Sequence, residues 1–209
     1  MARIYLDHAA TTPARPEVVE AMVPLLGGGY NPSSLYAEGR AARAALDSAR
    51  EVVAGVLGAV PREIVFTGGG SEADVFAVAG AARARTDRGR HVVTVATEHH
   101  AVLRTVDVLE RDGWRITRLP VGRDGLVDPE AFAAALTAET TVASVMLANN
   151  EIGVVQPVAQ LARLARERGI LFHTDAVQAA GWLPLRVDDL GADLLLLSAH
   201  KFHGPKGVG

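Results

Sequence analysis

The strongest constraint on the fold is an alternation of short apolar runs with longer helical patterns. Runs rich in Val, Ile, Leu and Thr predict strands at 64–67, 91–96, 114–119, 141–147, 169–174 and 193–198. Helical patterns predict helices at 15–26, 34–57, 72–85, 101–111, 128–136 and 157–168. Strands separated by helices are typical of parallel βαβ units, so we predict an α/β fold with a mostly parallel sheet. The run 114–119 alternates and is expected to be more exposed.

Composition excludes several classes of function. The net charge is −3 and there is no basic stripe, so nucleic acid is not an expected partner. No apolar run reaches the roughly 18 residues of a membrane helix, so no membrane association is expected. The chain has no cysteine, which excludes disulfides and thiolate zinc sites within it. We expect a cytoplasmic protein with residues 1–15 as an N-terminal arm and 16–209 as one domain.

Lys201 stands in an unusual turn directly after the apolar run 193–198, and Gly204-Pro205-Lys206-Gly207 follows it. Such an apolar strand fits a parallel sheet that is buried on both faces. The carboxyl ends of strands are where open α/β sheets hold ligands. A lysine there can lose its proton through partial burial, and a neutral amine can form a Schiff base. The alternative is a surface lysine after a core strand.

A glycine-rich loop at 67–72 lies between a predicted strand and a helix. Glycines let the backbone approach a ligand, and the free N–H groups of a helix start suit a phosphate. Ser71 could cap the helix or donate to a phosphate oxygen. The same loop matches a loose dinucleotide fingerprint, with Asp87 about 20 residues further on. Asp87 precedes the next strand instead of ending it, which disfavours that interpretation.

Two adjacent histidines, His99 and His100, follow the predicted strand 91–96. Neighbouring side chains on an extended segment cannot both face one ligand, so at most one of them is expected in a site. An imidazole there could stack on a flat aromatic cofactor. A metal shared with His200 or His203 is a weaker alternative, because no third ligand has a recognisable spacing.

Two more loops place polar side chains after strands. Asn149 and Asn150 fit either turn chemistry or an amide that donates to a ligand oxygen. Asp175 could cap a helix or pair with a protonated ring nitrogen, as an acid does for pyridoxal phosphate (PLP). Gln178 could reach the same ligand. Because all these loops end predicted parallel strands, we predict one cofactor pocket at that edge of the sheet.

Seven segments, in order, resemble the cysteine desulfurases, which are PLP enzymes of the class V aminotransferase group. They are 5–13, 31–34, 63–67, 97–99, 149–156, 173–178 and 198–201. The resemblance implies a three-layer, aspartate aminotransferase-like large domain with a mostly parallel sheet. Gly204-Pro205-Lys206-Gly207 favours the branch that serves iron–sulfur cluster assembly or nitrogenase maturation over selenocysteine lyase.

The resemblance also implies roles for particular residues. Lys201 would bind PLP and shuttle a proton, Asp175 would pair with the pyridine nitrogen, and His99 would stack on the ring. The remaining expected contacts are Gly70, Ser71, Ser198 and His200 at the phosphate, Gln178 and Asn150 at the ring oxygen, and Asn31 and Asn150 at the substrate. The implied reaction converts L-cysteine to L-alanine and passes sulfur through a persulfide. A homodimer and a sulfur-acceptor or iron–sulfur scaffold protein are the implied partners.

Two departures from the family pattern matter. Residues 71–75 read Ser-Glu-Ala-Asp-Val where relatives usually have Thr-Glu-Ser-Asp-Asn, so Val75 loses a polar group and Ala73 a hydroxyl. The family also continues into a small domain with a substrate-binding arginine and the catalytic cysteine. This chain stops at Gly209, so we expect an incomplete large domain with little or no turnover alone. The alternatives are another class V enzyme (an aminotransferase or selenocysteine lyase) and a non-catalytic, shortened PLP-binding protein.

Overall fold

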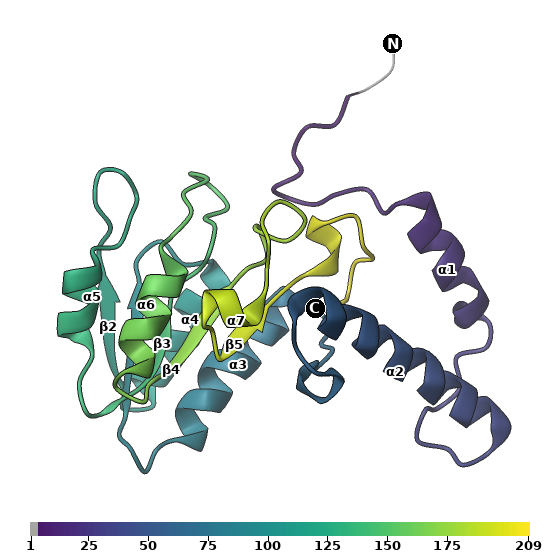
Figure 1. Ribbon diagram of the computed structural model, residues 1–209, viewed down its shortest axis with the longest axis horizontal. Coiled ribbons are helices and arrows are strands. Elements are labelled where there is room, and N and C mark those ends of the chain that lie inside the picture. Colours follow the sequence, from purple (N-terminus) through teal and green to yellow (C-terminus); the bar gives the residue numbers. More distant parts are fainter. Residues whose placement is uncertain (1–3) are drawn as a thin grey trace.

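The computed structural model describes residues 4–209 and contains one sheet of five parallel strands (Figure 1). The strands are β1 (His91–Val95), β2 (Arg115–Leu119), β3 (Thr140–Ser144), β4 (Leu171–Asp175) and β5 (Leu194–Leu196). Their order is β2-β1-β3-β4-β5, and each neighbouring pair runs parallel. The predicted parallel α/β fold is confirmed. The strand order reverses beside β1, and open sheets bind ligands at such a switch point, outside the carboxyl ends of the strands.

The six predicted helices are present, with ends that differ from the prediction by at most three residues. They are α1 (Pro16–Leu26), α2 (Ala37–Leu57), α3 (Gly70–Ala84), α4 (His100–Arg111), α5 (Pro129–Ala135) and α6 (Val158–Arg166). A short helix, α7 (Val187–Leu190), and 3₁₀ turns at Pro61–Glu63 and Ala199–Lys201 were not predicted. In Figure 1, α1 and α2 extend away from the sheet.

Helices cover both faces of the sheet and make three layers (Figure 1). On one face, Val78 of α3 and Leu109 of α4 are buried in a cluster with Val92 of β1. On the other face, Phe132 of α5 packs edge-on against Phe172 of β4, with ring centroids 6.2 Å apart. Successive residues of a strand point to opposite faces, so the fully buried strands must be apolar on both sides.

The prediction of a strand at 64–67 is wrong. The structure has no strand there, and Thr67 instead exchanges two backbone hydrogen bonds of 2.8 and 3.0 Å with Gly209. A single residue pair is too short to form a ladder. The expectation for 114–119 is confirmed, because β2 is an edge strand with only Leu119 buried.

The carboxyl end of β3 comes earlier than the apolar run predicted. β3 ends at Ser144, although the apolar run continues to Leu147. Val145 and Leu147 still donate backbone hydrogen bonds to His173 and Asp175, at 3.1 and 2.8 Å. These buried extensions lead the chain into the loops that hold the polar side chains.

Within residues 4–209, no helix combines the length and the apolar character that crossing a lipid bilayer requires.

Candidate active site

A cavity of about 230 Å³ lies at the carboxyl edge of the sheet, beside the switch point. All nine residues expected to bind a cofactor line it, together with three that the sequence did not single out. The twelve are Gly70, Ser71, Asp74, His99, Met146, Asn150, Asp175, Val177, Gln178, Ser198, His200 and Lys201. The fold therefore brings four separate loops and one helix start to a single place.

Asn31 is not among the residues that line this cavity. It lies on an exposed turn before α2, where its side-chain oxygen accepts a 2.9 Å hydrogen bond from the Ser33 amide. Its expected contact with a substrate stays a prediction.

The glycine loop starts α3 without any side-chain cap. The first N–H groups of such a helix have no partner within the helix, which makes its start suitable for an anion. Ser71 is not the cap, because α3 already begins at Gly70 with Gly69 before it. A Cβ on Gly70 would lie 3.2 Å from the Cβ of Ser198, so glycine permits this close approach.

Val75 does not line the first cavity. It lies on the exposed side of α3 and contributes to a second, mostly apolar hollow between α3 and α4. The difference from relatives, valine in place of the usual asparagine, therefore affects the lining of this second hollow. The dinucleotide alternative fails on geometry, since Asp87 lies in the turn before β1.

Asp175 ends β4 and is only 5% exposed. One of its carboxylate oxygens accepts a 2.9 Å hydrogen bond from the Val177 amide, and no helix follows, so it is not a helix cap. Burial raises the pKa of Asp175, while the Val177 amide, His99 and Lys201 oppose this shift. The Asp175 carboxyl group thus lines the cavity together with His99 and Lys201.

Asp74 is a second buried carboxyl group beside Asp175 and was missed by the sequence analysis. Burial, and then the charge of Asp175, raise the pKa of Asp74 to about 8. Its Oδ1 has no hydrogen-bond partner among the described residues, whereas Asp175 accepts from an amide. Burial and the charge of Asp175 therefore favour the protonated form of Asp74 at neutral pH. A helical spacing of four residues from Gly70 could have placed Asp74 on this side of α3.

A buried histidine and a buried glutamate lie behind these acids. His173 Nε2 is 3.7 Å from Asp74 Oδ1, and its Nδ1 bonds the Ser144 hydroxyl at 2.8 Å. Burial lowers the pKa of His173 to about 3, so the ring is neutral. Glu98 accepts a 2.8 Å hydrogen bond from the Met146 amide, and burial raises its pKa well above the usual range. Burial therefore disfavours charge on both side chains beneath the cavity.

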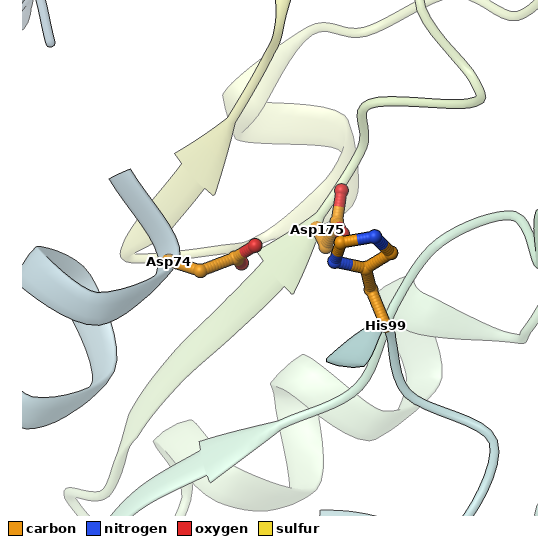
Figure 2. Close-up of side chains that lie close together, drawn as sticks. All are labelled: Asp74, His99 and Asp175. Carbon is orange, nitrogen blue, oxygen red and sulfur yellow. The ribbon is translucent and has the colours of Figure 1, made fainter. Parts of the chain in front are cut away.

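Asp74, His99 and Asp175 converge on one point, as Figure 2 shows. Their possible ligand atoms lie within 4.8 Å of one another, which resembles a three-ligand metal site. Metal ligands must be deprotonated, and the raised pKa of Asp74 opposes this at neutral pH. His200 and His203, which the sequence offered as alternatives, are not part of this group. We therefore do not assign a metal here.

In each of the adjacent pairs His99–His100 and Asn149–Asn150, only one residue lines the cavity. His99 lines the cavity, and its Nδ1 accepts a 3.2 Å hydrogen bond from the Ala101 amide, while His100 does not line it. Asn149 is buried and shapes the turn, since its side-chain oxygen accepts hydrogen bonds from the two amides at 151 and 152. Asn150 is left to face the cavity.

Lys201 reaches the cavity from a 3₁₀ turn after β5. Its Nζ donates to the backbone carbonyl of Ala10 at 3.0 Å and also to that of Ala9. Burial lowers the pKa of Lys201, and the charges of Asp175 and Asp7 oppose this. Gln178 Nε2 also donates to the Ala9 carbonyl, at 2.9 Å. The backbone at residues 9 and 10 therefore contacts two side chains that line the cavity.

The family model for class V aminotransferases (Aminotransferase class-V) matches residues 4–209. The chain belongs to the class V aminotransferase family. A curated relative, cysteine desulfurase IscS of Dictyoglomus turgidum, is 51% identical over 207 residues, which cover 99% of this chain and 52% of the relative. The putative cysteine desulfurase IscS 1 of Bacillus subtilis is 49% identical over 210 residues, covering 100% and 55%. The chain thus spans about half the length of the curated relatives it matches.

Solved structures agree with these sequence matches. The structure described as SspA in complex with cysteine superposes with a TM-score of 0.95 at 40% identity, covering 99% of this chain and 60% of that one. A NifS-like protein superposes at 0.96 with 37% identity, covering 100% and 58%. The resemblance to cysteine desulfurases and the PLP-dependent transferase fold of this family are both confirmed.

Proposed function

We propose that this chain forms the PLP-binding site of a cysteine desulfurase. One observation carries the proposal: the Lys201 amine, the buried Asp175 carboxylate and the uncapped start of α3 line one cavity. These are the three groups that a ring aldehyde, a ring nitrogen and a phosphate require. A side chain at Gly70 would crowd Ser198 in this cavity, and the backbone at the helix start and the Ser71 and Ser198 hydroxyls all line it, so the residues fit the cofactor.

Each side chain would then act in a definite way. Asp175 would hold a protonated ring nitrogen, and His99 would lie against the ring. Gly70, Ser71, Ser198 and His200 would contact the phosphate, and Asn150 and Gln178 the ring oxygen. When bound, PLP withdraws electrons from the α-carbon of an amino acid substrate. Lys201, whose pKa is lowered by burial, would attach the cofactor and later move the substrate proton.

The substrate we propose is L-cysteine, because the structural neighbour SspA is described in complex with cysteine. The products are L-alanine and a persulfide on an acceptor thiol. The 209 residues contain no cysteine, so that thiol must lie outside them. We also propose an iron–sulfur or related sulfur acceptor, a homodimer, and residues 16–209 as the cofactor-binding large domain with 1–15 as its arm. The cytoplasmic location stays a prediction.

The test is covalent attachment of PLP to Lys201. The protein is incubated with PLP, reduced with borohydride and mapped by mass spectrometry. The sequence holds only two lysines, Lys201 and Lys206, so the second is an internal control five residues away. We expect label on Lys201, its loss in Lys201→Ala and its retention in Lys206→Ala. Equal labelling of both lysines in folded protein would contradict the proposal.

A further inference from the structure

The turn that carries Lys201 contains a backbone conformation that side chains rarely adopt. His203 has a φ of 67° and is the only non-glycine residue with positive φ within residues 4–209. Such residues persist only where the surrounding structure holds them, and they concentrate at functional sites. The restraint on His203 should therefore be visible in its contacts.

Thr12 supplies that restraint from the far end of the sequence. It is only 4% exposed, and its hydroxyl accepts a 2.7 Å hydrogen bond from the His203 amide. The same hydroxyl donates to the His200 carbonyl at 2.9 Å, and the Thr12 amide donates to that carbonyl at 2.8 Å. Lys201 lies between the two residues that Thr12 joins. Both hydrogen-bonding roles of the hydroxyl are thus used on the lysine turn.

Residues that follow Thr12 in the sequence make further hydrogen bonds to the turn at 200–203. The Arg15 amide donates to the His203 carbonyl at 3.1 Å, and the His203 ring bonds the Pro13 carbonyl at 3.0 Å. The segment at 12–15 and the turn at 200–203 therefore form one hydrogen-bonded unit. The sequence pattern indicated only an N-terminal arm at residues 12–15, without a role in the site.

We propose that Thr12 is a positioning residue for Lys201, and that its hydroxyl fixes the turn that presents the lysine amine to the cavity. The inference rests on the proposed function, in which Lys201 attaches PLP. Valine has the shape of threonine but would leave the partly buried His203 amide without an acceptor, whereas serine keeps the hydroxyl. Thr12→Val and Thr12→Ser are therefore a matched pair.

The first test compares the rate of borohydride-trapped PLP labelling at Lys201 in wild type, Thr12→Val and Thr12→Ser. A displaced reactive group lowers rates steeply, so we expect Thr12→Val to label about ten- to a hundredfold more slowly. Thr12→Ser should remain within about threefold of wild type, since it keeps the hydrogen-bonding group. Circular dichroism checks that each variant is folded. Labelling of Thr12→Val at the wild-type rate would overturn the proposal and leave the proposed function intact.

A second test needs no cofactor. Trace acetic anhydride reports the reactivity of each lysine across pH, and Lys206 serves as the control in the same peptide map. Burial lowers the pKa of Lys201 against the charges of Asp175 and Asp7. A loosened turn would expose the amine, so the pH at which Lys201 reacts should rise in Thr12→Val but not in Thr12→Ser. An unchanged ratio of Lys201 to Lys206 labelling would contradict the role of Thr12.

The same test separates the two proposals. If wild type takes no PLP on Lys201 while acetylation still responds to Thr12, the proposed function fails and the positioning role stands. If Thr12→Val does not fold, the rate of hydrogen exchange at the His203 amide of the wild-type protein tests the positioning role instead. Slow exchange supports the hydrogen bond to Thr12, and exchange at the rate of an exposed amide overturns it.

Discussion

At the residue scale, the floor of the cavity is governed by the competition between burial and charge. Three carboxyl groups, Asp74, Glu98 and Asp175, are buried near one another, and the fully buried histidine beside them, His173, is neutral. Burial raises the pKa of each acid because water no longer stabilises the ionised form. For Asp175, the hydrogen bond from the Val177 amide and the nearby His99 and Lys201 oppose the rise in pKa that burial causes.

Asp74 makes a testable contribution to pH dependence. Its pKa is about 8 in the folded protein against 3.8 for an unperturbed aspartate, so folded protein holds a proton that the unfolded chain releases between these values. Stability should therefore fall as pH rises from about 4 to about 8. Asp74→Asn mimics the protonated acid and removes this fall, which makes it more stable than wild type at pH 8 by on the order of a few kcal/mol.

The measurement is urea unfolding of wild type and Asp74→Asn across this pH range. Asp189→Asn, on the exposed surface of α7, removes the same charge without changing burial and should leave the pH dependence unaltered. Parallel stability curves for wild type and Asp74→Asn would show that Asp74 is ionised in the folded protein. PLP attachment at pH 7 should survive Asp74→Asn.

At the scale of elements, α3 packs on one face of the sheet and also supplies residues that line the cavity. Its buried residues, such as Val78 and Ala82, pack against the sheet in a cluster with Val142 of β3, while residues of its uncapped start line the cavity. Helix position is therefore set by the apolar cluster, and Gly70 is where the backbone must come closest to Ser198. Packing and anion binding are thus linked through one rigid element.

Two glycines of α3 provide a matched pair of substitutions. Gly70→Ala would place a Cβ 3.2 Å from the Ser198 Cβ, and we expect PLP affinity to fall about tenfold as the loop is displaced. Gly80 lies on the exposed side of α3, where the Cβ added by Gly80→Ala would contact only the Phe76 ring, at 3.8 Å. It should leave PLP affinity unchanged and stabilise the protein by about 0.5–1 kcal/mol. Fluorescence titration with PLP and thermal unfolding measure both, and equal PLP affinities for the two variants would argue against a cofactor at the start of α3.

At the scale of the whole molecule, the chain forms three layers, with one sheet between two layers of helices (Figure 1). The cavity lies at the carboxyl edge of this sheet. Segments from both ends of the described chain meet there, because residues 9–15 hydrogen bond to residues 200–203. The site therefore depends on contacts across nearly the full sequence.

The absence of cysteine leads to a prediction about sulfur transfer. Incubation of the 209-residue polypeptide with PLP and sulfur-labelled L-cysteine should leave no persulfide on it, because no thiol is available to carry one. Mass spectrometry after alkylation measures this, and addition of a small thiol acceptor tests whether L-alanine forms. Persulfide label on this polypeptide would contradict the expectation.

The sequence by itself determined the parallel α/β fold, the positions of the six longer helices and the loops that follow β1, β3, β4 and β5, because these depend on local patterns of apolar residues. It also predicted the nine cofactor contacts, which the fold brings to one cavity. It wrongly predicted a strand before the glycine loop. The tertiary structure alone placed Asp74 and Thr12, since both act through partners far away in the chain. Asp74 acquires its raised pKa from burial beside Asp175, and Thr12 meets the lysine turn 188 residues away. Burial and long-range hydrogen bonds have no local signature, so only the folded chain reveals them.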